Sequence, residues 1–296
     1  MRSESGLTLV ELLAAMAIFL VVVSATLLAW EGFERGNLRV HDQEAAADGA
    51  RTTVDRLARD LRNHATPTPL MPEAIEKAEA QDVVLVTVGT ARPAGSANAR
   101  NLRRVRYCVA PASRALWTQE QRWTSATPPA APSTAGCPAT DGWTDTEQVA
   151  EHVTNGSRAA FSFAPAGWTD PNQIRTVGAS VWVDVDAARR PRETRLQTTV
   201  QLRNQNLPPI SGFTAQPVGN GHVVLSAATA RDPEGHRLEY VWRDGGQDLT
   251  DGADPECPNA PVCDLQTTLG THSFSLTVRD PSELETTSPA QVVTVG

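Results

Sequence analysis

A long apolar segment near the N-terminus constrains the fold of this chain more than any other feature. Residues 7–30 read LTLVELLAAMAIFLVVVSATLLAW, and no charged residue follows Glu11 before Trp30. As an α-helix this segment would be about 36 Å long, which exceeds the hydrocarbon core of a bilayer, about 30 Å thick. We therefore predict that residues 7–30 form a membrane-spanning helix and that the chain is a single-pass membrane protein.

The carboxylate of Glu11 is out of place in such a segment, because an unpaired charge inside lipid costs about 2.5–3.5 kcal/mol. An ordinary secretory signal has a basic start, an apolar stretch of 7–15 residues and a small-residue cleavage site. Here the start is MRSESG, in which Glu4 offsets Arg2, and the apolar stretch is longer. A plain membrane anchor remains one interpretation of the segment.

Gly6 followed by LTLVELL resembles the type IV prepilin signature, with Leu7 where Phe is commonest and with Glu4 weakening the positive charge of the leader. The resemblance implies that residues 1–6 are a leader removed by prepilin peptidase and that the amine of Leu7 becomes methylated. Glu11 is then the fifth mature residue. In this family its carboxylate is expected to pair with the N-terminal amine of a neighbouring subunit, which offsets the cost of a buried charge.

The helical pattern continues beyond the membrane segment. Ala47, Ala50, Val54, Leu57 and Leu61 recur at spacings of three and four, as in an amphipathic helix, and charged residues fill the other faces. Prolines at positions 67 and 69 end the pattern. We predict one helix over residues 7–63, although an anchor followed by a separate short helix is an alternative.

Residues 64–206 change to the short period of β-strands. DVVLVTVG begins at Asp82, RRVRYCVAP and ALWTQEQRWT suggest a hairpin, and RAAFSFAPAG, IRTVGASVWVDVDA and TRLQTTVQLRN supply further strands. The expected fold is α+β, a long helix packed on an antiparallel sheet, as in pilins. The order of these segments is also similar to W-type minor pilins and J-type pseudopilins of type II secretion.

Residues 207–296 form a different unit, entered through LPPISGF. Alternating strands with turns every 8–12 residues predict an all-β sandwich, and the phrases ARDPEGHRLEYVW and GTHSFSLTVRDPSELE resemble PKD-type or related immunoglobulin-like repeats. Asp232, Glu234 and Asp280 lie in turns of this unit. Such carboxylates either bind calcium or, more often, accept hydrogen bonds from the turn backbone.

The even number of cysteines favours two disulfides in an oxidising compartment. Four cysteines allow three pairings, and proximity within each unit favours Cys108–Cys137 and Cys257–Cys263. The first bridge would tether a loop rich in Pro, Ala, Ser and Thr, over residues 125–142, to a strand. None of the cysteines forms a CxxC pair or lies near a histidine in the spacing of a zinc site.

Composition and motifs narrow the function. The net charge of −8 argues against nucleic acid as a partner. The chain contains no GxSxG, HExxH or phosphate-binding glycine loop, and its six histidines are scattered, so we expect neither an enzyme nor a cofactor nor a metal site.

Two function classes remain. The first is a minor pilin or pseudopilin of a pilus, a type II secretion-like filament or a DNA-uptake apparatus. It would lie at the filament tip and contact other pilin subunits. The second is a membrane-anchored adhesin whose helix is only an anchor. In both, the globular part lies outside the cytoplasm, and an extracellular surface is a candidate ligand of the sandwich.

Overall fold

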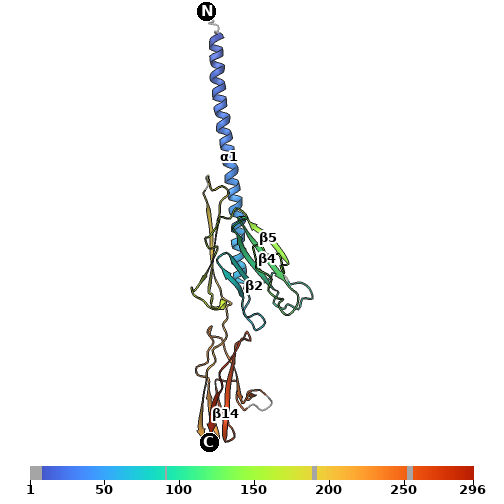
Figure 1. Ribbon diagram of the computed structural model, residues 1–296, viewed down its shortest axis with the longest axis vertical. Coiled ribbons are helices and arrows are strands. Elements are labelled where there is room, and N and C mark those ends of the chain that lie inside the picture. The colour runs from blue at the N-terminus through green and yellow to red at the C-terminus, as the bar shows by residue number, and fades with distance from the viewer. Residues whose placement is uncertain (1–8, 91, 189–191, 252–255) are drawn as a thin grey trace, which may run out of the picture.

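The computed structural model describes residues 9–90, 92–188, 192–251 and 256–296. A single helix, α1, runs without a break from Leu9 to Arg62 and is about 81 Å long at the usual rise per residue. Its first half projects away from the rest of the molecule (Figure 1). Over the described residues the helix is therefore continuous, and the alternative of two separate helices is wrong.

The second half of α1 packs against two antiparallel sheets, which together with it are called the body below. One sheet has the order β1-β2-β3-β4-β5 and the other the order β6-β7-β8. The strands are β1 (Ile75–Glu79), β2 (Asp82–Val88), β3 (Leu102–Ala110), β4 (Ala115–Arg122), β5 (Asp145–Ala150), β6 (Phe161–Ala164), β7 (Thr176–Val183) and β8 (Thr194–Gln201), with a short 3-10 helix, η1, at Pro171–Gln173.

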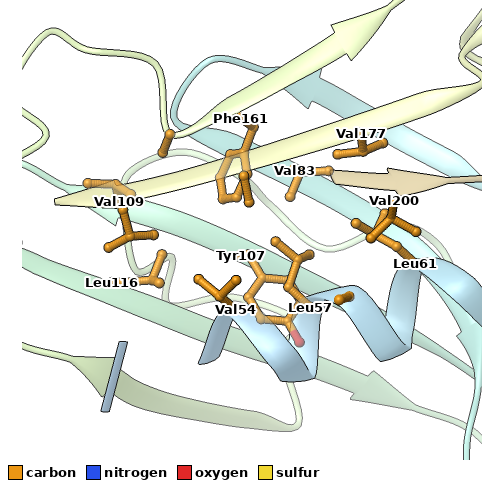
Figure 2. Close-up of a cluster of buried hydrophobic side chains, with 14 of the residues drawn as sticks. Val54, Leu57, Leu61, Val83, Tyr107, Val109, Leu116, Phe161, Val177 and Val200 are labelled. Atoms are coloured by element: carbon orange, nitrogen blue, oxygen red, sulfur yellow. The ribbon is translucent and has the colours of Figure 1, made fainter. Parts of the chain in front are cut away.

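The apolar stripe of the helix enters the core of the body, as its spacing predicts. Val54, Leu57 and Leu61 point toward Tyr107 and its neighbours on the five-stranded sheet, and Phe161, Val177 and Val200 cover them from the other sheet (Figure 2). Burial of such aliphatic side chains stabilises a fold by roughly 1.5–3 kcal/mol each. The helix thus serves as the shared centre of two sheets.

The remaining strands form further all-β sheets, called the C-terminal β unit below, at the end of the molecule opposite the free helix (Figure 1). One sheet has the order β13-β10-β9; the other has β12-β11-β14-β15, with β16 also paired to β14. The strands are β9 (Thr214–Gly219), β10 (His222–Ser226), β11 (Glu239–Asp244), β12 (Gln247–Asp248), β13 (Val262–Gln266), β14 (Gly270–Arg279), β15 (Glu285–Thr287) and β16 (Gln291–Val295).

The C-terminal β unit has a hydrophobic core of its own. Trp242 is fully buried there, and its ring meets that of Phe213 edge to face at 5.6 Å. No residue of this core cluster belongs to the core cluster of the body. The expected α+β class is confirmed: a long apolar helix packs on antiparallel sheets, and further β-sheets follow it.

Two strands of the body lack a recognisable sequence pattern. β1 reads IEKAE and β5 reads DTEQVA, and both lie at the edges of the five-stranded sheet. Edge strands pair on one side only, so they need no apolar alternation. Most side chains of β5 are exposed, whereas in β1 Glu76 pairs with Arg104 and Lys77 pairs with Asp82. Their position is set by the neighbours β2 and β4.

Candidate assembly surface and its supporting contacts

The first half of α1 has no cover from the rest of the chain. Its most apolar window is unburied, and it qualifies by length and composition as a membrane-spanning helix. Large side chains such as Leu9, Phe19 and Trp30 are each more than 60% exposed. Contiguous apolar surface of this extent is typical of a protein that enters a membrane or contacts other subunits.

Of the three residues predicted to act in processing and assembly, the structure describes only Glu11. Glu11 lies in the first turn of α1 with an exposed side chain. Gly6 and Leu7 lie outside the described residues. The helix as described begins two residues after Leu7.

The exposed part of the helix ends where Gln43 makes contact with β7. The amide nitrogen of Gln43 donates to the carbonyl oxygen of Val183 at 2.9 Å, and its amide oxygen accepts from the backbone N–H of Val185 at 3.0 Å. Both ends of one buried side chain thus bind the chain at the end of β7. Further along the helix, the Thr53 hydroxyl donates to the Val149 carbonyl of β5 at 2.9 Å.

The last turns of the helix are fixed by buried charges rather than by apolar contacts alone. Asp60 accepts a hydrogen bond of 2.7 Å from the Tyr107 hydroxyl and one of 2.7 Å from the Arg103 guanidinium. Burial raises the pKa of Asp60 although Arg103 and Tyr107 act in the opposite direction. Burial, and next the neighbouring Asp60, raise the pKa of Tyr107 well above its ordinary value.

Glu120 on β4 is the second carboxylate of this cluster and is almost fully buried. It accepts from Arg56 at 2.6 Å, from Arg122 at 2.6 and 2.9 Å, and from Arg103. Burial opposes ionisation of Glu120, but the hydrogen bonds from Arg122 and Arg103 hold its pKa below the usual range. The cluster joins α1, β3 and β4.

The charged residues that the sequence pattern assigns to the other faces of the helix include Asp60, and for Asp60 this expectation is wrong because its side chain is buried. Asp60 immediately precedes Leu61 and follows Leu57 by three positions, so it borders the apolar stripe. A carboxylate at that border turns inward when a hydroxyl and a guanidinium meet it there. The sequence signal was its position; the partners came from a strand more than 40 residues away.

The structure contains the two local bridges expected from proximity, Cys108–Cys137 and Cys257–Cys263. The first attaches the loop of residues 125–142 to β3. The second closes a short segment of the C-terminal β unit, where both sulfur-bearing residues are fully buried.

The loop attached by Cys137 covers polar side chains on the outer face of the five-stranded sheet. Arg106, 1% exposed, donates to the carbonyl oxygens of Thr134 at 3.0 Å and Gly136 at 2.6 Å, and also pairs with Asp82. Gln119 on β4 donates to the Ala139 carbonyl at 2.7 Å. Side chains of the sheet thus satisfy the backbone of a loop that has no regular structure.

The three turn carboxylates of the C-terminal β unit act within turns and at the junction with the body. Asp232 accepts from two backbone N–H groups of its turn, and Asp280 accepts from two of its own turn. Asn206 donates to Asp280, and Glu234 pairs with Arg175 of the body at 2.5 Å. Among the described residues, no group of three or more His, Cys, Asp or Glu side chains is placed to hold a metal ion.

Comparisons with known proteins add one match at the N-terminus. Residues 1–27 match the family model described as a prokaryotic N-terminal methylation motif. No curated protein matches the chain. These 27 residues include Gly6, Leu7 and Glu11.

Two solved structures are similar to parts of the chain. The crystal structure of the PKD1 domain of Vibrio anguillarum Epp is 22% identical with a TM-score of 0.24, over 30% of this chain and 95% of that one. The fibronectin(III)-like modules of Clostridium thermocellum CbhA are 14% identical with a TM-score of 0.25, over 76% of this chain and 90% of that one. The family match is the more informative: the N-terminal segment of this chain is prepilin-like and carries an N-terminal methylation motif.

Proposed function

We propose that this protein is a minor pilin or pseudopilin, a subunit that assembles into a type IV pilus or a type II secretion-like filament through α1. The observation that carries the proposal is the combination of the methylation motif with an uncovered apolar half-helix that continues without a break into the core of a β-rich body. Before assembly the apolar half lies in the membrane. In the filament, neighbouring subunits cover it.

The rigid attachment of the helix to the body supports a role in assembly beyond anchoring. A simple tether needs only a flexible connection, whereas Gln43, Thr53 and Asp60 fix the helix to three different strands or strand ends. A helix held in this way transmits the position of the body to the helical core of a filament. The body and the helix then move as one unit during insertion of the subunit.

We place the subunit at or near the filament tip, with residues 207–296 as an interaction module. A major pilin repeats many times, so its globular part must leave room for neighbours packed around the shared core. The C-terminal β unit extends the molecule beyond the body, at the end opposite the free helix (Figure 1). A tip subunit accommodates this extension because no neighbour lies above it. A separate hydrophobic core supports treating residues 207–296 as one module.

The competing proposal is a membrane-anchored adhesin, favoured by the added β unit alone. Processing separates the two functions, because a plain anchor keeps its first six residues. Mass spectrometry of the protein extracted from membranes tests this point. We expect a mature chain that starts at Leu7 with a methylated amine. A mature chain that starts at Met1, or after Ala29, would remove the basis for assembly through α1.

A second measurement tests the position in the filament. Immunogold labelling directed at residues 207–296 on intact filaments should mark one end. Label along the whole shaft contradicts the tip position. Deletion of residues 207–296 should leave filaments and abolish adhesion or secretion. Unchanged adhesion and secretion would mean that the β unit is a spacer and not a binding module.

A further inference from the structure

A pocket of about 290 Å³ lies beside the last two turns of α1, on the side of the five-stranded sheet. Its lining carries four guanidinium groups and two carboxylates, with an apolar wall that includes Trp123 and Leu102. The charged residues of the described lining are Arg56, Arg59, Arg103, Arg122, Asp60 and Glu120. The volume is just below the range for small-molecule sites, about 300–1,000 Å³, and suits one or two side chains.

The guanidinium groups that line the pocket outnumber the carboxylates that neutralise them. Three guanidinium groups, those of Arg56, Arg103 and Arg122, contact the single carboxylate of Glu120. Like charges so close repel one another, and one carboxylate neutralises only one of them. Asp60 also forms an ion pair with Arg103, and Arg56 forms one with Glu147, which does not line the pocket.

The excess is concentrated on two arginines at the rim. The side chain of Arg122 is 66% exposed, and its partner Glu120 is already contacted by two other arginines. Over the described part of the chain, the guanidinium of Arg59 makes no hydrogen bond or ion pair, and this side chain is exposed. Deeper in the pocket, the Nε donor of Arg103 is buried and has no acceptor among the described residues.

These donors fit a carboxylate. A guanidinium fork binds the two oxygens of a carboxylate in a planar, bidentate arrangement, and a second guanidinium strengthens the contact. A guanidinium fork also binds phosphate oxygens, so competition with inorganic phosphate must distinguish the two ligands. The pocket is also far from the membrane: 26 residues of helix separate Trp30 from Arg56, about 39 Å along the axis, so a lipid headgroup cannot reach it.

We propose that this pocket is a docking site for an acidic side chain on a loop of a neighbouring filament subunit, held by Arg59 and Arg122 at the rim. The neighbour follows from the proposed function, whereas the chemistry of the pocket does not depend on it. Docking here places a contact at the end of α1 that is distant from the membrane. The helical core and the bodies would then be held by separate contacts.

The test uses the full chain in neutral-detergent micelles. A fluorescent tetraglutamate peptide with blocked ends is titrated and its anisotropy followed, with the tetraglutamine peptide as the uncharged probe. We expect saturable binding of tetraglutamate, at least about tenfold weaker binding of tetraglutamine, and weaker binding of tetraglutamate at higher salt. Equal binding of both peptides, or no binding of tetraglutamate, would overturn the proposal.

Variants locate the binding on the molecule. The pair Arg59→Glu and Arg122→Glu should weaken tetraglutamate binding at least about tenfold. The matched pair Arg51→Glu and Arg62→Glu changes the net charge equally on exposed positions of α1 outside the pocket and should bind as the unmodified chain does. Equal losses in both pairs would show a nonspecific charge effect and overturn the site.

Two further arms keep the outcome clear. The pair Arg59→Gln and Arg122→Gln avoids repulsion of Glu120 and must also weaken binding, with thermal melting as the check on folding. Inorganic phosphate that displaces tetraglutamate at equal concentration would assign the pocket to a free anion instead. Cleavage after Gly6 is measured separately, so failure of the docking site and failure of the assembly function give different results.

Discussion

The hydroxyl of Tyr107 donates a 2.7 Å hydrogen bond to the carboxylate of Asp60, which joins the middle of β3 to the last turn of α1. Both side chains are buried, and Tyr107 is fully so. Because this contact lies where the helix ends, it fixes the orientation of the body relative to the exposed half-helix. Asp60 also lines the pocket that we propose as a docking site.

Replacement of Tyr107 by Phe should destabilise the body. The ring still fills its place in the core, but Asp60 loses a donor, and hydrogen bonds to charged groups contribute about 1.5–3 kcal/mol. We expect a loss of that order in the free energy of unfolding, measured by denaturant titration in micelles. Tyr240→Phe is the control, because the Tyr240 hydroxyl makes no hydrogen bond among the described residues. Similar losses for both variants would contradict a special role for the Asp60 contact.

The two disulfides should contribute unequally to stability. The Cys108–Cys137 bridge spans 29 positions and the Cys257–Cys263 bridge spans 6, and chain entropy favours the longer closure. Serine replacement of the first pair should cost about 3–4 kcal/mol, and of the second about 2–2.5 kcal/mol. We also expect faster amide hydrogen exchange over residues 128–139 in the first variant only. Protection that remains in this loop would show that Arg106 and Gln119 hold it without the bridge.

The C-terminal β unit should lose stability as the pH rises. Hydrogen bonds to Asp244 and to the Thr268 carbonyl raise the pKa of His272 above its ordinary value, near 6.5. Its stabilising contribution is complete below the unfolded value and is lost as the pH rises through the folded one. Replacement of His272 by Gln should reduce the change in the melting temperature of this unit between pH 6 and 9. A slope equal to that of the unmodified chain would exclude His272 as its source.

The body should respond to pH in the opposite direction. Burial lowers the pKa of His64, although a hydrogen bond with the Leu61 carbonyl acts against this. The folded state therefore binds a proton less readily than the unfolded one, and stability falls as the pH falls through about 6.5. His64→Gln should reduce the loss of stability of the body between pH 7.5 and 5.5. The measurement is the rate of hydrogen exchange at amides of the body. An unchanged loss would assign the pH dependence to other groups.

Replacement of Glu11 by Val should leave insertion into the membrane intact and impair assembly. The change removes the cost of placing a carboxylate in lipid and deletes the proposed partner of a neighbour's N-terminal amine. The measurement is the ratio of subunit in the membrane to subunit in sheared filaments. Ser24→Val, a polar-to-apolar change elsewhere in the same segment, is the control. Normal incorporation of the Glu11 variant would refute the pairing role.

Several features of the fold could be read from local sequence. The helix appears in the sequence as a long apolar run followed by a stripe at spacings of three and four, because helical periodicity is a property of neighbouring residues. The hairpin of β3 and β4 and the two short-range disulfides are local in the same sense. The methylation motif is contiguous, so it too needs no tertiary structure for its recognition.

The sequence by itself determined the apolar half-helix, the spacing of Gly6 and Glu11 in the methylation motif, and the change from helix to strands after residue 63. Only the tertiary structure decided which polar side chains are buried. The alternating pattern of its strand predicts that Arg106 faces solvent. Instead, a loop some 30 residues away in the sequence covers Arg106 and supplies acceptors for its guanidinium. Asp60 turns inward because Tyr107 and Arg103 meet it there. A buried charge is stable only where other groups supply its hydrogen bonds. Here those groups are far away in the sequence, and only folding brings them within hydrogen-bond distance.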